Sequence, residues 1–73
     1  MSRLIRMDRA GHSTLAEWTA GDAQAYEAAV VAFRRELERG YIGVLDEGEG
    51  HATHVRELPH EGLVILRAPV AGG

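Results

Sequence analysis

Hydrophobic and polar positions along the chain follow two different periods. Residues 22–39 have the period of an amphipathic helix, because four large apolar side chains recur there at spacings of three and four: Tyr26, Val30, Phe33 and Leu37. Asp22 is typical of an N-cap, and Gly40 is typical of the residue that follows a helix in the left-handed conformation. The charged residues Arg34, Glu36 and Glu38 fall mostly off the apolar face, and Arg34 and Glu38 have the spacing of an ion pair.

The remaining apolar runs are short and β-prone, and polar or glycine-containing turns separate them. Runs at 3–8 and 12–19 flank Gly11 and predict a hairpin. Three further strands are expected at 41–45, 51–58 and 63–67, with a polar turn at 46–50 and a loop at 59–62. Residues 63–67 are nearly all apolar, which is typical of a central strand buried on both faces or nearly so.

The predicted order ββαβββ indicates an α+β domain in which one helix covers one face of a small mixed sheet. The last strand is expected beside the first. The helical stripe and Trp18 are assigned to the core. The domain spans residues 1–68, and residues 69–73 are expected to form a flexible tail, since Pro69 cannot donate to a sheet and the final glycines have no packing group.

Composition narrows the possible functions. A chain of 73 residues forms one small domain, and the absence of cysteine excludes a disulfide framework, a thiolate metal site and a cysteine nucleophile. A net charge of −3 argues against nucleic-acid binding, which needs a concentrated basic field. The longest apolar run is far too short to cross a membrane, and the start lacks the apolar region of a signal peptide. A cytoplasmic protein with no membrane partner is expected.

All eight basic residues are arginines. A GC-rich genome explains this composition, as does a requirement that the chain carry no side-chain amine, and the two explanations are compatible. Either way, copies of the chain cannot be linked to one another through lysine.

Two histidines, His51 and His54, lie close to acidic residues and to His60. Imidazole and carboxylate ligands suit zinc or nickel. Positions i and i+3 of a strand face opposite sides, however, so no metal site is predicted here.

The end of the chain carries the most informative motif. An apolar strand, residues 63–67, is followed by Ala68 and then by Pro-Val-Ala-Gly-Gly at 69–73. Together with the order of elements, this end resembles the β-grasp family of ubiquitin and of the MoaD/ThiS-type sulfur carriers, and the tail is most similar to the sulfur carriers. The resemblance covers nearly the whole chain as an order of elements and about ten residues as a motif.

The resemblance implies a function for the glycines. In this family an E1-like enzyme uses ATP to adenylate the C-terminal carboxylate, and a thiol or sulfur donor then attacks the adenylate. Gly73 would be the reacting residue, and Gly72 would allow the tail to thread into a narrow pocket, where a side chain would block close approach. The residues that would contact the activating enzyme are Arg67, Pro69, Val70 and Ala71.

The same resemblance implies that the chain is not itself an enzyme and holds no cofactor or metal, since ATP is used by the activating enzyme. A sulfur-acceptor enzyme or a conjugation target would be a further partner. Ubiquitin has arginines four and two places before its last glycine, where this chain has Pro69 and Ala71. The apolar tail therefore favours a sulfur carrier over a protein modifier. The alternative is a non-conjugated binding or accessory module, for example phage or operon-encoded, that acts through the face of its sheet.

Overall fold

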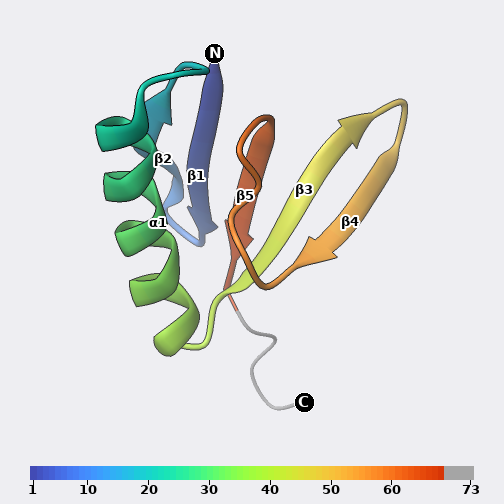
Figure 1. Ribbon diagram of the computed structural model, residues 1–73. Helices are drawn as coiled ribbons and strands as arrows, with labels where there is room; N and C mark the ends of the chain where they lie inside the picture. Colours follow the sequence, from blue (N-terminus) through green and yellow to red (C-terminus); the bar gives the residue numbers. More distant parts are fainter. Residues whose placement is uncertain (69–73) are drawn as a thin grey trace.

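A computed structural model describes residues 1–68 of the chain. It contains one helix and five strands in the predicted order: β1 (Ser2–Asp8), β2 (Gly11–Trp18), α1 (Ala23–Glu38), β3 (Ile42–Gly48), β4 (His51–Val55) and β5 (Leu63–Arg67). The α+β class predicted from the sequence is confirmed (Figure 1).

The strands form a single mixed sheet in the order β2-β1-β5-β3-β4. β5 lies in the middle and runs parallel to β1, with Leu4 opposite Val64, and every other neighbouring pair is antiparallel. The expected contact between the last and first strands is therefore confirmed. Figure 1 shows α1 along one face of this sheet, beside β1 and β2.

The helix begins and ends where its capping residues predict. The Asp22 carboxylate accepts a hydrogen bond from the backbone N–H of Ala25 at 3.0 Å, which satisfies one of the amides left free at a helix start. Arg39 is the C-cap, and Gly40 follows with φ of 98°. That left-handed conformation is costly for a residue with a β-carbon, which explains the glycine.

The core lies between α1 and the helix-facing side of the sheet. Phe33 is fully buried, and it packs among Leu4 of β1 and Val64 and Leu66 of β5. Trp18 is 3% exposed and belongs to this cluster, as predicted. The rest of the helical stripe packs against the core as partly buried side chains: Tyr26, Val30 and Leu37.

Gly43 of β3 lies directly against the ring of Phe33 from α1. A β-carbon there would lie 2.7 Å from Cε1 of Phe33 and 2.9 Å from the carbonyl oxygen of Val55. Only a residue without a side chain therefore fits between the Phe33 ring and the neighbouring strand.

The hairpin of β3 and β4 differs from the prediction. β3 continues through Gly48, so the turn is confined to Glu49 and Gly50, both with positive φ. β4 ends at Val55, earlier than expected. Backbone hydrogen bonds continue to pair β3 with β4 beyond the apolar residues of β3. The pattern of hydrophobic positions does not indicate this polar extension of the strand.

β5 is covered more fully on one face than on the other. Val64 and Leu66 point toward α1 and are buried, whereas Leu63 and Ile65 are only partly buried. The single helix covers one side of the sheet, and the opposite side has no layer over it among residues 1–68.

Candidate functional site

The predicted tail starts from the middle strand of the sheet. Arg67 is the last residue of β5, is exposed, and lies in register between Met7 of β1 and Ile42 of β3. The other predicted site residues lie outside the described part of the chain: Pro69, Val70, Ala71, Gly72 and Gly73. The structure thus describes the base of the tail and the side chains around it.

A buried carboxylate lies on the helix-facing side of the sheet, beside Arg6, which pairs in register with Leu66 of β5. Glu36 of α1 is only 5% exposed, and its two oxygens accept hydrogen bonds from Arg6 at 3.1 Å and from Arg39 at 3.3 Å. The helical pattern placed Glu36 mostly off the apolar face, yet its side chain is buried. Arg6 lies two residues after Leu4 in β1, so the two side chains share the face of the sheet that points toward the helix. The Arg6 guanidinium meets Glu36 on that face.

Electrostatics hold this cluster in its charged form. Burial raises the pKa of Glu36, but the hydrogen bonds and positive charges of Arg6 and Arg39 outweigh it and leave the pKa below its ordinary value. The hydrogen bond to Glu36 likewise raises the pKa of Arg6, whose guanidinium lies 5.8 Å from the centre of the Tyr41 ring. Arg34 and Glu38, both within the described residues, do not pair with each other, although their spacing permits it.

The side of the sheet that faces away from α1 carries an apolar row. Ile5, Ile65 and Val44 are aligned in register across three strands, and each is partly buried. Beside Arg67, Met7 is 42% exposed and Ile42 is 36% exposed. We call these five residues the open-face row. Apolar side chains grouped on a face without a covering layer are typical of interaction surfaces.

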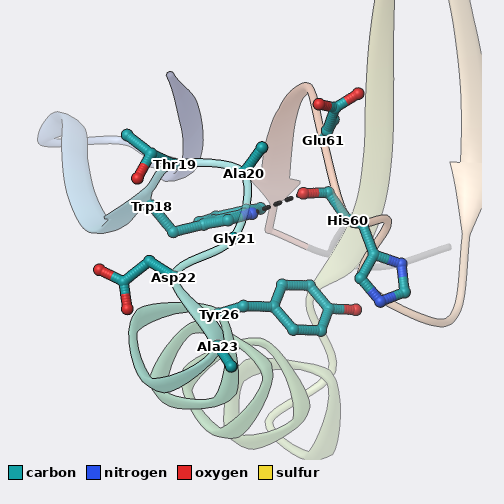
Figure 2. Close-up of a pocket in the computed structure, with 9 residues that line it drawn as sticks. All are labelled: Trp18, Thr19, Ala20, Gly21, Asp22, Ala23, Tyr26, His60 and Glu61. Carbon is teal, nitrogen blue, oxygen red and sulfur yellow. Dashed lines mark hydrogen bonds between the residues drawn. The ribbon is translucent and has the colours of Figure 1, made fainter.

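A pocket of about 430 Å³ lies at the other end of the molecule, at the start of α1. Figure 2 shows Trp18 and Tyr26 as neighbouring walls, with His60 beyond the tip of Tyr26. The two aromatic rings are 5.9 Å apart at 62°, and the Tyr26 ring stacks on His60 at 4.5 Å. Asp22 and Glu61 are the acidic residues of its lining. We call this the aromatic pocket.

Hydrogen bonds fix the walls of the aromatic pocket. The Trp18 indole N–H donates to the carbonyl oxygen of His60 at 2.7 Å, and the Tyr26 hydroxyl donates to that of Leu58 at 2.5 Å. The two bonds join β2 and α1, respectively, to the segment that precedes β5. The sequence indicated Trp18 and Tyr26 as core residues but gave no sign of a pocket, because the pocket depends on where that distant segment returns.

The remaining candidate features do not gather into a site. Among residues 1–68, no three His, Asp or Glu side chains are placed to hold a metal ion. Within the same range, no helix has the length and apolar character needed to cross a membrane.

Comparison of the chain with models of protein families, with curated proteins and with solved structures found no match. Function is therefore inferred from the residues and the geometry described above.

Proposed function

We propose that this chain is a ubiquitin-like carrier that is activated at Gly73. An E1-like enzyme would join the Gly73 carboxylate to the α-phosphorus of ATP, which releases pyrophosphate and leaves an acyl-adenylate. Hydrosulfide, or an enzyme that supplies it, would then attack the acyl carbon and displace AMP, which leaves a thiocarboxylate. Attack by an amine of a target protein would instead give an amide-linked conjugate.

One observation carries the proposal: a Gly-Gly motif, at residues 72–73, follows, after four intervening residues, the middle strand of a sheet that has one helix on one face. β5 is hydrogen-bonded to a neighbour on each side, so Arg67 is held on a rigid base. The strand order β2-β1-β5-β3-β4, with β1 parallel to β5, is compatible with a β-grasp fold. Such a domain presents a tail from a fixed point, as a carrier needs when its terminus must enter another protein's active site.

The residues of the tail agree with this function. Gly72 and Gly73 have no side chains to obstruct close approach of the backbone to a nucleotide. Pro69 cannot extend the ladder of β5, because it has no backbone N–H. The reacting atoms belong to the main chain, so the proposal needs no catalytic side chain within the domain.

Intact-mass spectrometry of the untagged protein from its native host tests the proposal. A species heavier by the difference between one sulfur and one oxygen atom, located at Gly73 by fragmentation, is the expected result for a sulfur carrier. Larger species joined through Gly73 are expected for a modifier. The same spectra show whether the unmodified protein ends in a free Gly73 carboxylate. The proposal requires that carboxylate, and it holds equally if Gly73 ends the translated chain or is exposed by cleavage.

A matched pair of variants separates activation from folding. Gly73→Val places a branched side chain at the reacting residue, whereas Val70→Ala makes a smaller change in the same tail. We expect the first variant to abolish the modified species and the second to retain it, with unchanged thermal unfolding in both. If Gly73→Val is modified as fully as the wild type, or if no modified species exists, the carrier proposal is wrong.

The open-face row favours a second candidate function, a binding module that acts through its sheet. Met7 and Ile42 are large apolar side chains that are 42% and 36% exposed, and they lie beside three further apolar residues on the same uncovered face. For this function Met7→Ser with Ile42→Ser would abolish activity in the host, while Gly73→Val would have no effect. The carrier proposal predicts loss of activity with Gly73→Val.

A further inference from the structure

Charge is distributed unevenly between the two ends of the molecule. The strand registers and the direction of α1 place every arginine except Arg3 in the half that holds the last turns of α1 and the end of β5. Arg3 is paired with Glu17 at 3.3 Å. The opposite end holds the start of α1, the β3–β4 turn and the aromatic pocket, and most of its charged side chains are acidic: Glu17, Asp22, Asp46, Glu47, Glu49 and Glu61.

The segment at the basic end complements the pocket at the acidic end. Arg67 is followed, after Ala68, by Pro69, Val70 and Ala71, so a cation precedes a short apolar stretch. The lining of the aromatic pocket combines aromatic ring surface with two acidic residues, Asp22 and Glu61, and the described residues that line it include no arginine. Its volume lies within the range of pockets that hold small ligands, about 300–1,000 Å³.

The segment cannot fill the pocket of its own molecule. Trp18 pairs with Ser2 and Arg67 pairs with Met7, so the pocket wall and the base of the tail are separated by five residues along β1, or about 17 Å at 3.3 Å per residue. Ala71 is four residues beyond Arg67 and reaches at most about 14 Å. The path also has to pass from β5 to the start of α1, which adds to the distance (Figure 1).

We propose that residues 67–71 of one copy bind in the aromatic pocket of a second copy. The apolar residues would lie against Tyr26 and His60, and Arg67 would lie near Glu61, one of the two acidic residues of the lining. The two surfaces involved are different, so the contact is head-to-tail and adds further copies as concentration rises.

Two measurements on the full chain test this inference. Sedimentation equilibrium at low salt is expected to show a weight-average mass that increases with concentration, and added salt is expected to reverse the increase by screening the charges. A synthetic peptide of residues 67–73 is expected to shift the single Trp18 indole N–H resonance, because that group lies in the pocket wall and bonds His60. The peptide is also expected to lower the weight-average mass.

Charge-swap variants identify the surfaces. Glu61→Arg alone and Arg67→Glu alone are each expected to weaken self-association by about tenfold, as a like-charge contact replaces an opposite-charge one. The two changes in one chain restore opposite charges, so most of the loss is expected to be recovered. Glu57→Arg is the matched control, since it makes the same charge change outside the aromatic pocket and is expected to leave association unchanged.

Three results would overturn the inference: a mass that stays monomeric at every concentration, a peptide that leaves the indole resonance unmoved, or an association that Glu61→Arg and Glu57→Arg weaken equally. The inference goes beyond the proposed carrier function and does not depend on it. Neither measurement involves ATP or an activating enzyme, so a negative result here leaves the mass-spectrometric test of Gly73 unaffected.

Discussion

Replacement of Gly43 by alanine is expected to destabilise the fold through one overpacked contact. The added β-carbon would lie 2.7 Å and 2.9 Å from Cε1 and Cζ of Phe33, and 2.9 Å from the Val55 carbonyl oxygen. The Phe33 ring is fully buried, and the carbonyl belongs to the backbone of β4, so neither yields without moving its neighbours. Overpacking of this kind costs about 1–3 kcal/mol.

The net effect is smaller than the steric cost. Alanine is favoured over glycine within a strand by about 0.5–1 kcal/mol, which offsets part of the steric cost. Because two close contacts put that cost near the top of its range, we expect the free energy of unfolding to fall by about 2 kcal/mol. A domain of this size has a free energy of unfolding of only about 3–5 kcal/mol. The midpoint of thermal unfolding is therefore expected to fall by about 10 °C.

Urea unfolding followed by Trp18 fluorescence measures the change, because Trp18 is 3% exposed in the fold and becomes exposed on unfolding. Phe33→Leu removes the ring atoms that the added β-carbon would meet, so the double variant is expected to lose less stability than the sum of the single variants, by about 1 kcal/mol. The Val55 contact remains, so recovery is incomplete. Ala52→Val, on the exposed part of β4, is the control. Strict additivity, or an unchanged midpoint for Gly43→Ala, would refute the argument.

Three further predictions concern single interactions. Because the pKa of Glu36 is depressed in the fold, its charge contributes stability above its ordinary pKa of 4.5, and this contribution is lost as pH falls through the lower folded value. Glu36→Gln is therefore expected to destabilise the protein in urea unfolding at pH 7, and to destabilise it progressively less as the pH falls through the lowered folded pKa and the wild-type carboxyl becomes protonated. Tyr26→Phe leaves the Leu58 carbonyl without its donor and is expected to lower the free energy of unfolding by about 1 kcal/mol in the same assay. Asp22→Ala removes the N-cap and is expected to cost about 1 kcal/mol, with earlier loss of helical circular dichroism on heating.

The charge and cap variants each have a control on the same element. Glu38→Gln and Glu27→Ala change exposed acidic residues of α1 and are expected to alter stability by no more than about 0.5 kcal/mol. If Glu38→Gln shows the same pH dependence as Glu36→Gln, the depressed pKa is not the cause. If Glu27→Ala costs as much as Asp22→Ala, the loss reflects general helix charge and not the cap.

The sequence alone determined the order of elements and most of their boundaries, because those depend on local chemistry. The period of Tyr26, Val30, Phe33 and Leu37 defined one helix face, and Asp22 and Gly40 defined its ends. The place of β5 beside β1 also followed, since its nearly continuous apolar character requires a position inside the sheet.

Tertiary structure decided what depends on the meeting of distant segments. The helical pattern placed Glu36 mostly off the apolar face, and it is buried because Arg6, on a strand thirty residues away, supplies an opposite charge. The need for glycine at position 43 appears only when Phe33 crosses above it. The aromatic pocket likewise forms only where His60 returns to Trp18, forty-two residues away in sequence. Periodicity reports which face of an element is apolar, whereas the partner of each side chain is set by how the elements are placed against one another.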